Sequence, residues 1–381
     1  AKQADCLPGW EEYDECQREG CDYNTKVEIP ANGKHSYVCD VCTTCGECNP
    51  VKYTREGYNI YFGYWPQTCE RDENVIAKLN EMAGTIPEYT IYTVLEKPEN
   101  WAYYENSKDI WYIDVIYSGT KYRGIYMKEF RPAINGSLGY SYISANHYTN
   151  HQVYWFKVEP IKWRILTTSN NSAYIMSDVA LEAGFYNGEY GIFRGTKESD
   201  VDGTYANNWE YCFLRGWLNE TFYNEVFNDL QKEIIQTTRL DNSARSCNPD
   251  EYPTYYPDTY SSQNKPGENK YAAQCKDTDD KIFLLSLRDI TTTAYGFNKD
   301  VRAKDPARNL QATDFAKFRG APMDIYEEKY VTWYTRSPSI GSRGGNDGYS
   351  TFVLDRHAKG AIDSTDLTPD GGVVPALWIT I

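Results

Sequence analysis

The distribution of cysteine constrains this chain more than any other feature of its sequence. Eight of the 11 cysteines lie within the first 69 of 381 residues. A segment of about 50 residues buries too little apolar surface to be stable unaided, so cross-links or a metal ion are expected to hold it. The sequence therefore predicts a cysteine-rich module over residues 1–50, ended by Asn49 and Pro50, in front of a larger domain.

Two chemistries are open to these cysteines. Cys16 and Cys21, followed by Cys39 and Cys42, have the spacing of a zinc ribbon, in which two short loops each present two thiolates to one ion. Zinc is therefore a candidate cofactor, with these four cysteines as predicted ligands. His35 is a further donor, although a lone histidine near a glycine turn is more often a surface residue. In an oxidising compartment the same cysteines can instead pair as disulfides, and the spacing leaves both alternatives open.

The charge of the chain argues against several classes of partner. Lys and Arg number 39 against 54 Asp and Glu, a net charge of −15, and no basic stretch offsets it. Such a surface repels phosphate backbones, so no nucleic-acid partner is expected. No run approaches 18 apolar residues, so no membrane span is predicted.

Aromatic residues are frequent, with 35 Tyr and 10 Trp. Their broad apolar faces and polar edges suit sugar or protein recognition, although many short strands would also favour them. The start at Ala1, without an initiator Met, is expected of the mature product of a secreted precursor. Together with the acidity and the cysteines, these features predict an extracellular or cell-surface location.

The pattern after residue 57 predicts an α+β fold and not a parallel doubly wound sheet. A helix is expected over Asp72–Met82, with Gly84 as its stop, and a buried helical stripe at Trp209, Phe213 and Trp217. Short runs of aromatic and β-branched residues predict strands. The first six are Tyr58–Trp65, Ile110–Tyr117, Tyr122–Phe130, Val153–Val158, Ile161–Thr167 and Ala173–Ser177.

Residues 247–275 form a Tyr- and Pro-rich segment with almost no aliphatic residues, so they are expected to be a surface loop. Cys247 and Cys275 stand at its two ends, and a disulfide between them would close it. Tyr255 and Tyr256 within this loop are candidate ligand contacts.

Several motifs along the chain resemble a known family. They are Ile60-Tyr-Phe-Gly-Tyr-Trp-Pro-Gln-Thr68, Pro160-Ile-Lys-Trp-Arg-Ile-Leu166, Trp333-Tyr-Thr-Arg-Ser-Pro338 and Gly372-Val-Val-Pro-Ala-Leu-Trp378. Together they resemble a bacterial domain of unknown function, common in gut Firmicutes, related to the C-type-lectin and formylglycine-generating-enzyme superfamily. The resemblance covers residues 57–381, with insertions at about 85–150 and 247–275.

This resemblance implies a C-type-lectin-like fold in which the N- and C-terminal strands pair and long loops present a variable surface. The superfamily's enzymes use a cysteine pair near the C-terminus, and no cysteine follows Cys275, so no enzymatic activity is expected. In the first module, the segment from Cys21 to Tyr37 resembles a short cysteine-containing repeat of Gram-positive surface proteins, which implies surface display.

The C-terminal loops carry the candidate ligand-binding residues. Residues 339–371 are rich in Gly, Asn and Asp, which give a binding face backbone freedom and oxygen ligands. Asp363, Asp366 and Asp370 also offer oxygen atoms to Ca²⁺, although their spacing does not match an EF-hand and ordinary turns explain it as well. The candidate contacts are Arg343, Asp347, Tyr349, Asp355, His357, Asp363 and Asp366, together with Tyr255 and Tyr256.

Two functions follow as expectations. The first is a secreted or surface-displayed, non-catalytic recognition protein, such as an adhesin, that binds an extracellular glycan or protein through its C-terminal loops. The alternative is a structural subunit that associates with itself in an extracellular filament or surface layer.

Overall fold

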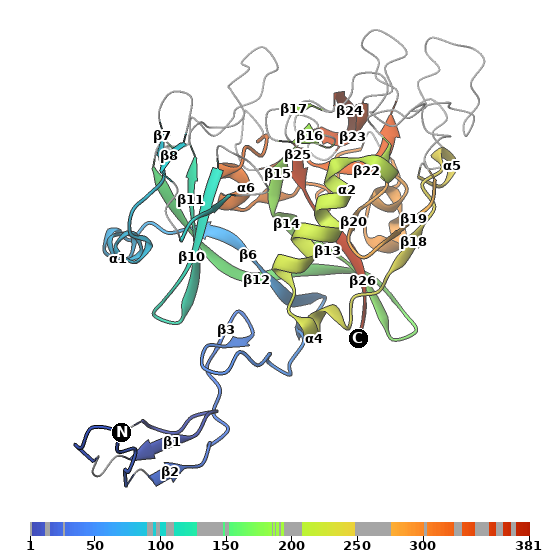
Figure 1. Cartoon of the computed structure of the whole chain (residues 1–381). Helices are drawn as coiled ribbons and strands as arrows, with labels where there is room; N and C mark the ends of the chain where they lie inside the picture. The colour runs from blue at the N-terminus through green and yellow to red at the C-terminus, as the bar shows by residue number, and fades with distance from the viewer. Residues whose placement is uncertain are drawn as a thin grey trace, which may run out of the picture.

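The computed structural model of the chain has a small N-terminal module beside a larger mixed domain (Figure 1). The structure describes residues 2–11, 16–25, 27–89, 94–96, 100–103, 110–127, 148, 152–184, 186, 188–189, 192–193, 208–247, 276–300, 303–323, 330–339, 350–355, 361–366 and 371–381. Over this part of the chain, a few short helices accompany one nine-stranded sheet and several small sheets. The mixed class expected from the sequence is therefore confirmed.

The central strand of the large sheet is β12 (Val153–Ser169), whose 17 residues pair along both edges. β6 (Asn59–Cys69) occupies one edge, while β11 (Thr120–Met127) and β13 (Ser172–Ser177) share the other. Beyond β11 the sheet continues with β10 (Ile110–Tyr117) and β9 (Ala102–Tyr103), and beyond β6 with β5 (Thr54–Glu56). Beyond β13 it continues with β26 (Pro375–Thr380) and β20 (Phe283–Leu284). Thus β10 and β11, from a stretch expected to be an insertion, belong to the main sheet.

Two expected strands, Val153–Val158 and Ile161–Thr167, are one continuous strand. The prediction of a break at Pro160 was wrong because the register of β12 against β6 shifts on both sides of this residue, between Lys157 and Val158 and between Pro160 and Lys162. Such irregularities accommodate a proline that lacks the N–H donor of a regular ladder.

The C-type-lectin resemblance implied that the C-terminal strand pairs with the first long strand of the main domain, β6. The structure does not have this pairing. β26 pairs with β13 and β20, so β13 and β12 lie between it and β6. In this position four of the six residues of β26 are buried, and the half-buried Trp378 ring stacks on Tyr174 with a centroid distance of 5.0 Å. Both backbone edges of β26 are thus paired, with β13 on one side and β20 on the other.

The helices match the sequence pattern closely. α1 (Glu73–Ala83) begins after the Asp72 N-cap, whose carboxylate accepts from the amide of Asn74, and it ends at Gly84. The expected apolar stripe begins in η4 (Trp209–Tyr211), which ends at the extended residue Cys212. It goes on in a continuous helical run of α2 (Phe213–Trp217), the π-helical turn η5 (Leu218–Phe222) and α3 (Tyr223–Val226). The remaining short helices are α4 (Asp229–Lys232), α5 (Ala244–Cys247), η7 (Asp289–Thr291), η8 (Thr293–Tyr295) and α6 (Asp314–Phe318).

The helical run packs on β6 through aromatic side chains. The Trp65 ring lies edge-on to Trp217 at 6.0 Å and tilted against Phe222 at 5.1 Å. All three residues belong to the larger of two buried cores, and the smaller core lies where Leu79 of α1 meets Trp111 and Trp155. In the part of the chain that the structure describes, no helix has both the length and the apolar character needed to cross a membrane.

Short strands complete the fold. In the N-terminal module they are β1 (Gly9–Glu11), β2 (Val27–Ile29), β3 (Tyr37–Val38) and β4 (Val41–Cys42). In the main domain they are β7 (Glu88–Tyr89), β8 (Val94–Glu96), β14 (Val179–Ala180), β15 (Glu182–Gly184), β16 (Gly188–Glu189), β17 (Ile192–Phe193), β18 (Thr238–Leu240), β19 (Thr278–Asp280), β21 (Gln311–Ala312), β22 (Tyr334–Ser339), β23 (Ser350–Asp355), β24 (Ala361–Asp366) and β25 (Gly371–Val373).

A test of this packing is available at Gly63, where Phe62 and Gly63 together oppose Ile161 in a bulge of β6. Gly63 has a φ of +67°, and a Cβ there would lie 2.5 Å from the Phe227 ring. We expect Gly63→Ala to lower the free energy of unfolding by about 2–4 kcal/mol, from backbone strain and overpacking together.

Gly119→Ala is the matched control, since Gly119 has a φ of +77° with no atom within 4 Å of the added Cβ. It should cost about 1 kcal/mol, from strain alone. Urea unfolding of both variants measures the difference, and equal losses would contradict the packing of the helical run on β6.

Candidate metal centre

A tight hairpin positions the first residues of the candidate metal centre. β3 and β4 pair with Tyr37 opposite Cys42 and Val38 opposite Val41, so Cys39 and Asp40 alone form the turn. Both turn residues have positive φ, of 50° and 58°, as the favoured two-residue hairpin turn requires. The hairpin leaves Cys42, which is buried, at the end of β4.

The chain then turns back at once after Cys42. The Gly46 amide donates to the Cys42 carbonyl at 2.9 Å, and the Cys42 amide donates to the Glu47 carbonyl at 2.8 Å. Gly46 has a φ of +79°, which glycine adopts without strain. This Cys-x2-Cys-Gly turn brings Cys45 back beside Cys42.

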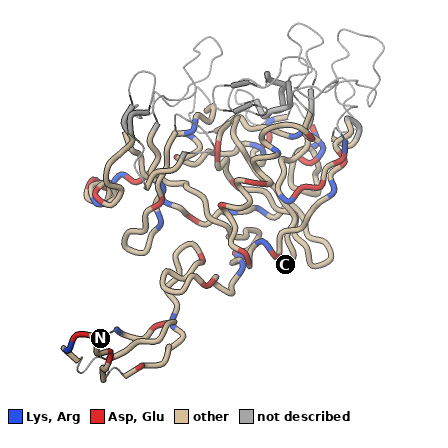
Figure 2. Tube along the Cα trace, viewed as in Figure 1, with Lys and Arg blue, Asp and Glu red and all other residues tan. Residues whose placement is uncertain are grey.

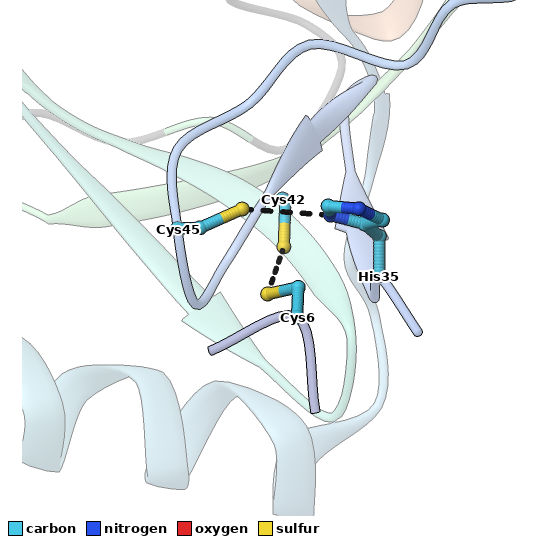
Figure 3. Close-up of side chains that lie close together, drawn as sticks. All are labelled: Cys6, His35, Cys42 and Cys45. Atoms are coloured by element: carbon cyan, nitrogen blue, oxygen red, sulfur yellow. Dashed lines mark hydrogen bonds between the residues drawn. The ribbon is translucent and has the colours of Figure 1, made fainter. Parts of the chain in front are cut away.

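Four donor atoms meet at this turn, from Cys6, His35, Cys42 and Cys45, all within 4.8 Å of one another (Figure 3). The Cys6 and Cys42 sulfurs are 3.6 Å apart, and the Cys45 sulfur is 3.4 Å from Nδ1 of His35. Two thiolates on a tetrahedral zinc ion lie about 3.8 Å apart, and a thiolate and an imidazole nitrogen about 3.6 Å. The cluster therefore has the size of a four-coordinate metal site.

The histidine ring is held for this role from its other side. Nε2 of His35 lies 3.6 Å from a carboxylate oxygen of Glu47, and the ring stacks on Tyr37 with a centroid distance of 5.5 Å. A carboxylate on the second ring nitrogen orients a metal-bound histidine and sets which nitrogen is free for the ion.

The backbone also favours a thiolate at Cys42. The amide of Cys45 is the largest influence on the Cys42 thiol, and with the Thr44 amide and His35 it outweighs burial and lowers the pKa of Cys42 to about 5. Burial, together with hydrogen bonds to Cys45 and Cys42, raises the pKa of Cys6 to about 12. Since a metal binds the thiolate, Cys42 offers the first ligand, and binding at Cys6 releases a proton.

The structure gathers a different set of residues from the one that the zinc-ribbon spacing indicated. Of Cys16, Cys21, Cys39 and Cys42, Cys42 alone belongs to the cluster. The Cys39 thiol turns to the main domain, where its sulfur lies 3.9 Å from the carbonyl of Val158, and burial raises its pKa to about 11. Cys16 instead contacts Cys21, and its hydrogen bond lowers the pKa of the Cys21 thiol.

Two of the four donors, Cys6 and Cys45, were missed by the sequence analysis. The glycine after Cys45 was the available signal, because it permits the turn that returns Cys45 to Cys42. No spacing rule points to Cys6, which lies 36 residues before Cys42 and reaches it by tertiary contact.

The predicted ligand-binding residues lie mainly outside the described residues: Arg343, Asp347, Tyr349, His357, Tyr255 and Tyr256. Asp355, Asp363 and Asp366 fall in the β23–β24 hairpin, where Asp363 is paired with Val353 and Asp366 with Ser350. Cys275 is also outside the described part of the chain, so the predicted disulfide with the buried Cys247 stays a prediction.

Three arginines of the main domain make contacts within the fold, one of them buried (Arg336) and two half-buried (Arg215 and Arg164). Arg336 donates to the Leu284 carbonyl and to the Asp289 carboxylate, each at 2.9 Å. Arg215 is bonded to Asp280 at 2.7 Å and Arg164 to the Ala307 carbonyl at 3.0 Å. These contacts hold loops together, as buried charged groups require.

The fold and this site define a protein with a Cys/His module of metal-binding geometry joined to a mixed-sheet domain. The sequence model of the family described as "Domain of unknown function (DUF6273)" matches residues 170–381, which is more than half of the chain, so the chain belongs to this family. No curated protein and no solved structure matches this chain. The family match covers β13 to β26 and not the metal cluster.

Substitutions can distinguish the ligand set predicted from cysteine spacing from the set that the structure brings together. We expect the reduced full chain to bind one Co²⁺ per molecule with the absorption of a tetrahedral thiolate site. Cys45→Ser should abolish this spectrum, because it removes a donor of the cluster. Cys48→Ser and Cys16→Ser are the controls and should keep it. Loss of the spectrum in Cys16→Ser, with retention in Cys45→Ser, would contradict the observed cluster.

Proposed function

We propose that this chain is a non-catalytic recognition protein of the cell surface or extracellular space, in which a zinc-stabilised module carries a domain that binds glycan or protein. The observation that carries the proposal is the closed set of four donors at Cys42. Catalytic zinc sites keep a position open for water or substrate, whereas structural sites fill all four with protein ligands. The metal centre is therefore assigned to stability.

Zinc is the ion that suits these donors best. Three sulfurs and one imidazole nitrogen form a Cys3His set, which is common in structural zinc sites. Calcium prefers hard oxygen ligands, and soft thiolates disfavour it. A metal-held module is also consistent with the small size of this segment, which has too little apolar surface to be stable alone.

The arrangement of the main domain supports a recognition role at its far end. The strands β16, β17, β23 and β24 lie at the end of the domain opposite the N-terminal module (Figure 1). Asp355, Asp363 and Asp366 belong to β23 and β24 at this end. The sequence motifs resemble a superfamily that contacts ligands through its C-terminal loops, although β26 does not pair with β6 as that resemblance implied. This part of the proposal is therefore an analogy from sequence motifs.

The charge distribution favours neutral or mixed ligands over polyanions. Acidic and basic residues are interspersed over the described parts of the main domain, without a continuous basic segment among them (Figure 2). With a net charge of −15, long-range attraction of nucleic acid or other polyanions is not expected.

A glycan array and a pull-down of host and plant polysaccharides, with the zinc-loaded full chain, test this proposal. We expect a ligand whose binding is lost in the double variant Asp363→Ala/Asp366→Ala, because these residues lie on the proposed binding hairpin. Glu81→Ala, on the exposed face of α1, is the matched acidic control and should bind normally.

Two outcomes would contradict the proposal. One is the absence of any ligand above background together with turnover of a substrate. The other is assembly of the purified protein into regular filaments in negative-stain images, which would favour the structural alternative.

A further inference from the structure

A separate cleft of about 270 Å³ lies where the N-terminal module meets the main sheet. It is bounded by the turn of the β3–β4 hairpin, the linker before β5, and the strands β5 and β6. Three half-buried tyrosines line it, Tyr53, Tyr61 and Tyr64. No residue of the metal cluster is among the described residues around it, so the cleft is distinct from the metal centre.

One wall of the cleft is rigidly built around the Asp40 carboxylate. One oxygen of Asp40 accepts from the Asn49 amide at 3.0 Å, and the other accepts from the Gln231 amide of α4 at 3.1 Å. Burial, and then the Asp40 charge, raise the pKa of Tyr64, so its hydroxyl stays protonated. A ligand therefore meets groups that are already fixed in place, which reduces the entropy lost on binding.

The lining identifies the class of ligand. Tyrosine rings have electron-rich faces that attract the slightly positive C–H groups of a sugar ring, and their hydroxyls bond to sugar hydroxyls. Asp40 and Glu56 add carboxylates, which accept strong hydrogen bonds from hydroxyl donors. Among the described residues that line the cleft there is no Lys or Arg, so acidic sugars and phosphates are disfavoured.

The volume limits the size of the ligand. At about 270 Å³ the cleft is just below the roughly 300 Å³ at which pockets for drug-sized molecules begin. We propose that this tyrosine-lined cleft binds a single neutral sugar ring, free or at the end of a glycan. This proposal does not depend on the proposed function, because the cleft is lined by residues around β5 and β6 and not by β23 or β24. The strands β23 and β24 lie at the end of the domain opposite the N-terminal module (Figure 1).

Saturation-transfer NMR and titration calorimetry on the zinc-loaded full chain test the cleft. The probes are the methyl glycosides of glucose, galactose, mannose and N-acetylglucosamine, with glucuronic acid as the anionic comparison. We expect at least one neutral glycoside to bind and glucuronic acid to bind more weakly. Tyr61→Ala should reduce the affinity about 10-fold, as loss of a central aromatic contact does.

The control is Tyr58→Ala, since Tyr58 is 81% exposed on the turn before β6 and does not line the cleft. It should leave affinity unchanged. Glu56→Gln, on the exposed face of β5, should weaken binding without affecting folding, which thermal unfolding verifies.

Failure of all neutral glycosides to bind would overturn the inference, as would equal affinity in Tyr61→Ala and Tyr58→Ala. A glycan that binds in the array and is insensitive to Tyr61→Ala, but is lost in Asp363→Ala/Asp366→Ala, would reject the cleft and leave the proposed function standing.

Discussion

The Cys42 thiol lies where three separate segments of the N-terminal module converge. Cys6 approaches from the first strand region, His35 from the chain before β3, and Cys45 from the turn after β4. Four donors around one point replace the apolar core that so short a segment cannot build. Zinc held there would act as the core of the module.

The same hairpin also connects the module to the main domain. Its turn residue Asp40 bonds to Gln231, which is itself buried at the capping box of α4, and Cys39 contacts β12 at Val158. Beyond it, Lys52 of the linker forms an ion pair with Glu233 at 2.6 Å. The hairpin that carries Cys42 thus also carries Asp40, which lines the tyrosine-lined cleft.

Local signals in the sequence predicted local structure well. Asp72 and Gly84 mark the two ends of α1, and Ile110–Tyr117 is β10 to the residue. Pairings set by tertiary packing were not predictable in this way. The burial of β26 between β13 and β20, the continuation of β12 through Pro160, and the approach of Cys6 to Cys42 all depend on contacts between distant segments. Spacing alone grouped Cys39 with Cys42, whereas in the structure Cys39 lies in the hairpin turn and its thiol contacts the main domain at Val158.

Hydrogen exchange of the N-terminal amides, with and without zinc, shows whether a metal ion holds this module together. The amides of Cys42, Thr43 and Asn49 are bonded within the module, to the carbonyls of Glu47, Ser36 and Asp40. If the metal holds the module, these amides should exchange at least about 10-fold faster after chelation, while those of β12 and β13 stay protected. Equal protection of the module in zinc-loaded and chelated protein would mean that the metal does not hold the module.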